Sequence, residues 1–216
     1  MSKTEPLSVV PKGKILLPYE PELRGVDKVS SGYKVATQIE SNRNGQSILF
    51  CPIESGGVTF GKYVEDAMKM LAVPYRRLPF EVNGDRQKIL SPTRTEISEE
   101  ILKLKDEYKK DVIAVPFDDT VLGGRRLLTL YGFLKDNQDY LGINDIPIAT
   151  FIEDRGIVDY VGAEGFRAKI RENKDEALKR FRSTRKTPAK RMGAYFYEIF
   201  AYLKRREDKL GRALML

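Results

Sequence analysis

The sequence predicts an α/β fold, a mainly parallel sheet of five strands with helices on both faces. Short apolar runs rich in β-branched residues alternate along the chain with longer segments of helical periodicity. Turn residues separate these segments, and 41% apolar residues in a chain of 216 suffice for a sizeable core. We place this domain at residues 26–160, after a proline-rich extended arm at 1–25 and before a basic helical segment at 161–216.

In the first part of the domain, the pattern predicts helix, strand, helix and strand. A helix over 26–40 has apolar residues at helical spacing, namely Val29, Tyr33, Ala36 and Ile39. The strand "SILFCPI" leads through the tight loop "ESGG" into a helix over 58–71 with an apolar face. The next run, "VPYRRLPFEV", is typical of a single strand. These elements form a strand, loop and helix unit followed by a further strand.

The second part continues the alternation. "NGDRQKILSPTRT" is predicted to be an exposed loop, and "EISEEILKLKDEYKK" a charged helix with Thr95 as its N-cap. "DVIAVPFDDTVLGGRRLLTLYGFL" supplies a strand and a helix, and "IPIATFI" a further strand. Ligands of such folds bind at the carboxyl ends of the strands, where "ESGG" and "DDTVLGGRR" both fall.

Composition narrows the possible chemistry. The chain has no histidine, which excludes Ser-His triads, Cys-His dyads and His-ligated zinc. Its single cysteine, Cys51, lies in an apolar strand and is expected to be a buried structural thiol. No run of 18 apolar residues is present, so we expect a cytoplasmic protein with no membrane partner. Any catalysis must therefore use carboxylates, cations and backbone dipoles.

The residues 118–126 have the parts of a phosphate site. Glycines such as Gly123 and Gly124 let backbone N–H groups approach an anion closely, and Arg125 and Arg126 add charged donors. Two adjacent acids precede them and suit Mg²⁺ or sugar hydroxyls. A ribose 5-phosphate would satisfy both ends. A solvated turn between strand and helix is the alternative that the spacing leaves open.

Two motifs resemble those of type I phosphoribosyltransferases. "VIAVPFDDTVLGG" resembles their diphosphoribosyl-binding motif, and "ILFCPIESGGVTFGKYVEDAMKML" resembles their pyrophosphate loop. The resemblance implies transfer of ribose 5-phosphate from phosphoribosyl pyrophosphate to a nucleobase, a purine or related heterocycle, with Mg²⁺. It also implies a role in nucleotide salvage and a homodimer.

The resemblance assigns residues to each task. The phosphoribosyl pyrophosphate site would consist of Glu54, Ser55, Gly56, Gly57, Asp118, Asp119, Thr120, Val121, Leu122, Gly123, Gly124, Arg125 and Arg126. The metal would be held by Asp118 and Asp119, which are the expected catalytic residues together with Arg77. A lid over residues 76–94 would bring its cations to the site, and Phe151 and Tyr160 would stack on the base.

The sequence departs from the family pattern at three places. The changed loop at 123–126 and the missing general base favour an alternative, whereas the intact acid pair opposes it. Gly123 stands at the motif's threonine, and Arg125 and Arg126 replace the usual hydroxyl residue. Leu122 occupies the place of a catalytic aspartate of the 6-oxopurine enzymes, which argues against a plain hypoxanthine-guanine enzyme. The alternative is a phosphoribosyltransferase-like protein that has lost catalysis and senses a nucleotide or binds nucleic acid.

The carboxyl-terminal segment carries the basic surplus of the chain. Residues 167–212 hold 16 Lys/Arg against 6 Asp/Glu, so this segment is +10 while the whole chain is +7. Its apolar stripe, formed by Tyr195, Phe196, Ile199, Phe200 and Leu203, is more typical of core or a dimer contact than of base stacking. The flanking cations predict possible contact with nucleic-acid phosphates, although a solvated face is the commoner arrangement.

Overall fold

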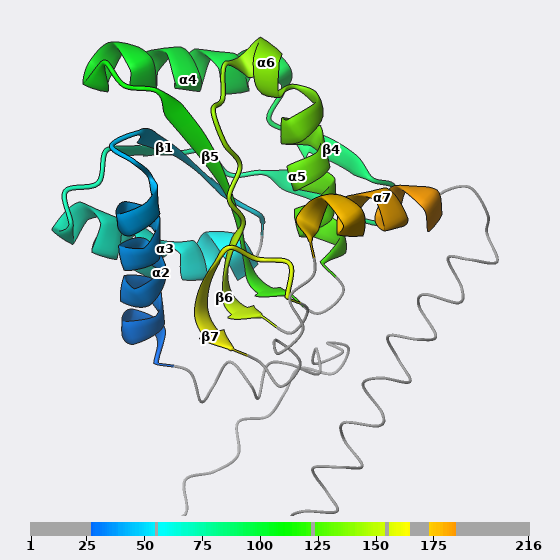
Figure 1. The fold of residues 1–216 in the computed structure, drawn as a ribbon, viewed down its shortest axis with the longest axis horizontal. Coiled ribbons are helices and arrows are strands. Elements are labelled where there is room, and N and C mark those ends of the chain that lie inside the picture. The colour runs from blue at the N-terminus through cyan, green and yellow to red at the C-terminus, as the bar shows by residue number, and fades with distance from the viewer. Residues whose placement is uncertain (1–26, 55, 122–123, 154–155, 165–172, 185–216) are drawn as a thin grey trace, which may run out of the picture.

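The computed structural model describes residues 27–54, 56–121, 124–153, 156–164 and 173–184 (Figure 1). The predicted extended arm and the stripe of residues 195–203 therefore lie outside the described residues. None of the helices in the described ranges has the length and hydrophobicity of a membrane span.

A parallel sheet of five strands forms the centre of the domain, which confirms the predicted fold class. In spatial order its strands are β2 (Tyr75–Arg77), β1 (Ser47–Pro52), β5 (Val112–Val121), β6 (Ala149–Glu153) and β7 (Tyr160–Glu164). Each neighbouring pair is parallel. Because β7 begins where the predicted domain ended, the sheet continues four residues beyond position 160.

Helices cover both faces of this sheet. The first face carries α2 (Lys28–Asn42) and α3 (Gly56–Met70). The second face carries α4 (Arg94–Tyr108), α5 (Arg125–Asp136), α6 (Gln138–Leu141) and α7 (Lys174–Thr184). Successive residues of β5 point to opposite faces, so odd-numbered Ile113 and Val115 join the first core while Val112 and Ala114 join the second. Figure 1 shows α7 beside α5.

The buried face of α2 differs from the predicted one. Of the four predicted residues, Ala36 and Ile39 are fully buried, whereas Val29 and Tyr33 are 68% and 46% exposed. Gly32 and Val35 complete the buried face. A Cβ added to Gly32 would lie 2.7 Å from the backbone of Tyr63 on α3. The two helices approach so closely that the contact favours small residues over large apolar ones.

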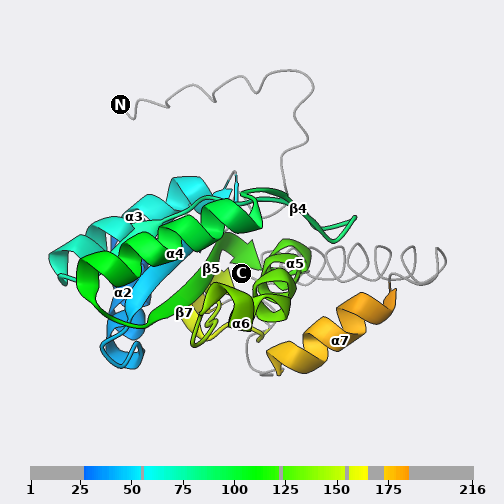
Figure 2. The same cartoon turned by 90° about the horizontal axis from the view of Figure 1, so that it is seen from above.

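The segment predicted as one strand and one loop forms a separate hairpin. "VPYRRLPFEV" is divided between β2 of the large sheet and β3 (Glu81–Asn83). β3 pairs antiparallel with β4 (Lys88–Ser91), which lies within the predicted loop. Figure 2 shows β4 beside α5. The residues 76–94 are thus ordered elements of the fold, and the prediction of an exposed loop is wrong at β4.

The N-cap of α4 lies two residues earlier than predicted. Thr93, rather than Thr95, is the N-cap, and its hydroxyl accepts a hydrogen bond from the Glu96 N–H. The Glu96 carboxylate accepts in return from the Thr93 N–H at 2.7 Å. This reciprocal pair satisfies two donors that the first turn of a helix would otherwise leave unpaired.

The outer edge of β7 is paired with a side chain of α2. The Gln38 amide donates to the Val161 carbonyl oxygen at 2.9 Å and accepts from the Val161 N–H at 3.2 Å. Gln38 therefore takes up both backbone hydrogen-bonding groups of one residue on this edge strand.

Candidate functional site

The two segments predicted to bind ligand meet at the carboxyl edge of the sheet. Pro52 at the end of β1 pairs with Phe117 of β5, and the Ile53 N–H donates to the Phe117 carbonyl oxygen at 2.8 Å. Shortly afterwards α3 begins at Gly56. The end of one strand, the start of a helix and the end of a second strand thus converge at one place.

The glycines of "ESGG" are required by this convergence. A Cβ added to Gly57 would lie 2.8 Å from the Phe117 carbonyl oxygen, and one added to Gly56 would lie 2.3 Å from the Asp119 carboxylate. Both distances are shorter than a Cβ atom tolerates. At Gly57 the clash is with backbone, so α3 or β5 would have to shift, whereas at Gly56 the Asp119 side chain would have to move. Close packing is therefore sufficient to explain both glycines, independently of any ligand.

Arg126 connects the two segments directly. It lies in the first turn of α5, and its Nη1 donates to the Glu54 carbonyl oxygen at 2.8 Å. Its Nη2 lies 3.1 Å from Oδ1 and 3.0 Å from Oδ2 of Asp118. One guanidinium thereby holds together the turn after β1, the end of β5 and the start of α5.

Asp118 is a buried carboxylate whose charge depends on this arginine. Its side chain is 5% exposed, and Oδ1 also accepts from the Asp119 N–H at 3.0 Å. Burial raises the pKa of Asp118 well above its ordinary value, and the neighbouring Arg126 guanidinium offsets only part of that effect. Arg126 is the cation that stabilises the ionised form.

The adjacent acids lie within a strand and not in the loop that the sequence predicted. β5 continues to Val121, with Asp118 opposite Thr150 and Thr120 opposite Ile152 of β6. Asp118 therefore reaches toward α5, while the carboxylate of Asp119 lies against the start of α3. They contact different neighbours on the two faces of the sheet, so they are not arranged as a joint clamp around one ion.

Asp118 and Asp119 fit Mg²⁺ only if the bound ligand and water supply most of the atoms that coordinate the ion. Among the described residues, no group of three or more Asp, Glu, His or Cys side chains could hold a metal. In proteins Mg²⁺ is commonly bound through one or two carboxylates together with the phosphate oxygens of a substrate. A single carboxylate from this acid pair would meet that requirement, and the remaining ligands would come from the bound molecule and water.

The start of α5 has the features expected of an anion site. Gly124 is its N-cap in a left-handed conformation with φ of 64°, which glycine adopts without strain. Arg125 forms an ion pair of 2.9 Å with Asp85, at the tip of the β3–β4 hairpin. The hairpin thus lies against the start of α5. Of the other predicted residues here, Thr120 and Val121 end β5, whereas Ser55, Leu122 and Gly123 lie outside the described residues.

Arg77 lies beside the first turn of α3. Its Nε is 3.2 Å from Oε1 of Glu65 on α3, an ion pair whose atoms are not aligned for a hydrogen bond. Its Nη2 donates to the Val58 carbonyl oxygen at 3.4 Å. Arg76 points to the other face and pairs with Glu107 of α4 at 2.9 Å. In this arrangement both arginines connect β2 to helices, Arg77 to α3 and Arg76 to α4, and the predicted lid stays a prediction.

Phe151 and Tyr160 belong to the core of the first face. Phe151 is fully buried and packs against Phe60 and Phe117 with ring centroids 5.5 and 5.8 Å apart. Tyr160 is 8% exposed, and burial raises its pKa to about 12. Neither ring has a free face in this arrangement, and their predicted stacking on a base stays a prediction.

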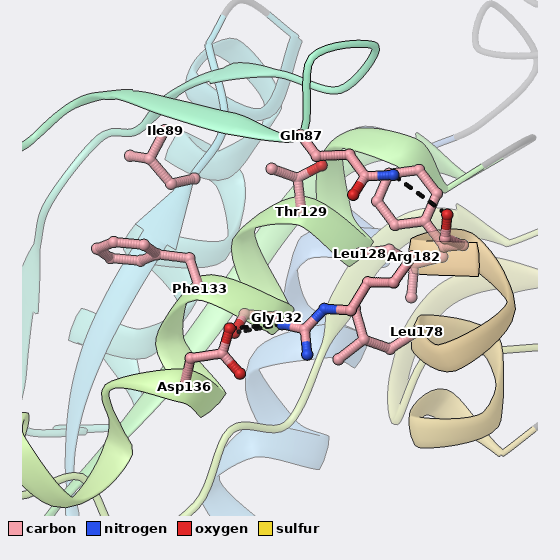
Figure 3. A pocket seen from close by; sticks show the side chains of 10 residues that line it. Gln87, Ile89, Leu128, Thr129, Gly132, Phe133, Asp136, Leu178 and Arg182 are labelled. Atoms are coloured by element: carbon pink, nitrogen blue, oxygen red, sulfur yellow. Dashed lines mark hydrogen bonds and ion pairs between the residues drawn. The ribbon is translucent and has the colours of Figure 1, made fainter. Parts of the chain in front are cut away.

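A cavity of about 380 Å³ lies elsewhere, between the hairpin, α5 and α7 (Figure 3). Ile89, Phe133 and Leu178 provide apolar walls, and Arg182 and Asp136 form an ion pair of 2.6 Å at its side. None of the predicted catalytic, metal-binding or ligand-binding residues lines it, although Gln87 and Ile89 belong to the segment 76–94 that was predicted as a lid. The sequence did not predict this cavity because the hairpin, α5 and α7 lie far apart in the chain and β4 was predicted to be part of a loop.

No family model matches the sequence, and no curated protein matches it significantly. Similar solved structures include the hypoxanthine phosphoribosyltransferase of Trypanosoma cruzi, with 18% identity, a TM-score of 0.48, and coverage of 64% of this chain and 77% of that one. They also include a mutant of that enzyme in a ternary substrates complex, with 16% identity, a TM-score of 0.49, and coverage of 64% and 76%. Its complex with the product IMP shows 17% identity, a TM-score of 0.48 and the same coverage.

Proposed function

We propose that this chain binds phosphoribosyl pyrophosphate where the ends of β1 and β5 meet the starts of α3 and α5. There it would transfer ribose 5-phosphate to a nucleobase, a purine or related heterocycle. The observation that carries the proposal is the position of Arg126, which contacts both Glu54 and Asp118. These two residues lie in the two segments whose sequences resemble the pyrophosphate loop and the ribose phosphate loop.

Each end of the ligand has matching groups in this proposal. The 5-phosphate would lie at the start of α5, where backbone N–H groups and the guanidinium groups of Arg125 and Arg126 favour an anion. The ribose hydroxyls would donate to Asp118 or Asp119. The pyrophosphate would lie at the start of α3, near residues 54–57. The ligand would thus extend across the carboxyl edge of the sheet.

The reaction needs positioning more than acid-base chemistry. A bond from the anomeric carbon to a base nitrogen forms as the bond to the pyrophosphate oxygen breaks, and the ribose passes through a state with positive charge on the ring. The first turn of α3 would stabilise the negative charge that builds on the leaving pyrophosphate. When bound, Mg²⁺ would supply further neutralisation of that charge. Arg77 lies beside the first turn of α3, where it donates to the Val58 carbonyl oxygen, and its predicted catalytic role stays a prediction.

Isothermal calorimetry with phosphoribosyl pyrophosphate, with and without Mg²⁺, tests the binding step. We expect binding in the wild type and a loss of about 1–3 kcal/mol in Asp119→Asn, the range for a hydrogen bond to a charged group. Asp136→Asn is a matched control at the exposed far end of α5 and should bind like the wild type. Absence of binding at millimolar ligand would contradict the proposal. Release of pyrophosphate with a panel of nucleobases then tests catalysis.

A second candidate is a phosphoribosyl-binding protein without catalysis. The engagement of both Asp118 carboxylate oxygens by Arg126 favours it, because a catalytic acid pair would be open to the ribose. Ligand binding without pyrophosphate release for any base would support this candidate. A homodimer, a cytoplasmic location and nucleic-acid binding by the basic segment stay predictions, since most of that segment lies outside the described residues.

A further inference from the structure

We infer that the Arg126–Asp118 ion pair makes this site selective for molecules that carry both a phosphate and sugar hydroxyls. Neither free phosphate nor an unphosphorylated sugar would then bind well. The inference rests on the proposed function for the identity of the site, and it concerns which part of the ligand each member of the pair recognises. It follows from the different surroundings of the two side chains.

When the ion pair breaks, Asp118 and Arg126 differ in whether water can replace the lost partner. Asp118 is 5% exposed, while Arg126 is 38% exposed and can turn toward water. A buried carboxylate that loses its cation has a high free energy unless new donors replace the lost ones. Asp119 N–H supplies one donor to Oδ1, which is insufficient to replace a guanidinium. Breaking the ion pair therefore raises the free energy mainly through Asp118, which is left buried without its cation.

Three kinds of ligand meet this cost differently. An inorganic anion can engage Arg126 but has no hydroxyl to donate to Asp118, so it leaves a buried carboxylate unpaired. A neutral sugar can donate to Asp118 but gives Arg126 no anion. A sugar phosphate supplies both groups at once. The pair therefore penalises each partial ligand, and only the complete one provides a new partner for both Arg126 and Asp118.

The Glu54 contact extends this selection to the pyrophosphate side. Arg126 Nη1 donates to the Glu54 carbonyl oxygen in the turn before α3. When Arg126 turns to a phosphate, that carbonyl is released together with Asp118. Binding of the phosphate at the start of α5 thus makes the Glu54 carbonyl and the Asp118 carboxylate available to the rest of the ligand.

Phosphate binding to an asparagine variant tests the inference. In Asp118→Asn the arginine is no longer held by a buried charge, so the affinity for inorganic phosphate, measured by calorimetry, should rise at least tenfold. The affinity for ribose 5-phosphate should rise less or fall, since the hydroxyl acceptor is weakened. Asp136→Asn changes the net charge equally and should alter phosphate affinity less than twofold. The double variant Asp118→Asn with Arg126→Gln should lose the gain.

The outcomes separate this inference from the proposed function. Unchanged phosphate affinity in a folded Asp118→Asn protein would overturn the inference, even if the wild type binds phosphoribosyl pyrophosphate. A tenfold gain in phosphate affinity in Asp118→Asn, together with no binding of phosphoribosyl pyrophosphate by the wild type, would support the inference and contradict the proposed function. If Asp118→Asn does not fold, Arg126→Gln serves instead: it should reduce the preference for ribose 5-phosphate over ribose, and an unchanged preference would overturn the inference.

Discussion

Replacing Arg126 and Arg125 by alanine, one at a time, should have very different effects on stability. The two residues are neighbours in the first turn of α5, and each pairs with an aspartate. Asp118 is 5% exposed, whereas Asp85 is 82% exposed. Removing one partner of a buried ion pair costs about 3–5 kcal/mol, and the partial exposure of Arg126 brings our expectation to about 2–3 kcal/mol. An exposed pair contributes about 0–1 kcal/mol, which is our expectation for Arg125→Ala.

Urea denaturation followed by circular dichroism measures both values without screening the ion pairs. Adding Asp118→Asn to Arg126→Ala should recover at least about 1 kcal/mol, because the amide removes the unpaired buried charge. Adding Asp85→Asn to Arg125→Ala should change little. Equal losses for the two alanine variants, or no recovery in the first double variant, would refute the argument that the burial of Asp118 makes this contact important.

Three further predictions concern other contacts. Burial raises the folded-state pKa of Asp118 above its unfolded value of about 4, so the folded protein retains this proton to higher pH. The free energy of unfolding should therefore fall as the pH rises above about 4, and urea titrations should show a smaller fall in Asp118→Asn. Gly57→Ala should lower the free energy of unfolding by about 1–3 kcal/mol, because the new Cβ would meet the Phe117 carbonyl oxygen at 2.8 Å; an unchanged melting temperature would contradict this. Thr93→Ala should cost about 1 kcal/mol and Thr95→Ala less than about 0.5, since only Thr93 caps α4.

The local sequence pattern predicted those elements whose structure depends mainly on residues close together in the sequence. The alternation of "SILFCPI", "ESGG" and the helix after it was sufficient to predict β1 and α3, because the run is apolar and the glycines interrupt it. The cap of α4 was also readable, since Thr93 and Glu96 have the spacing of a capping box. Choosing Thr95 overlooked that signal.

Long-range contacts decided what local pattern could not. Aspartate is rare in strands, so the acid pair predicted a loop, but pairing with β6 extends β5 through both acids. The partners of Arg77 and Phe151 are likewise distant in sequence: Glu65 holds the first, and aromatic residues of α3 and β5 bury the second. The convergence of residues 54–57 with 118–126 was foreseeable because carboxyl ends of parallel strands share one edge.

The pairing of Gln38 with Val161 bears on how the molecule behaves at high concentration. An exposed edge strand offers free N–H and carbonyl groups to a strand of another molecule, which is a common start of aggregation. At Val161 the glutamine amide already occupies both groups. The Gln38 amide makes the two hydrogen bonds that one residue of an added strand would make, but it offers no strand edge with which a further strand could pair. α2 thereby protects the β7 edge against association between chains as well as covering the core.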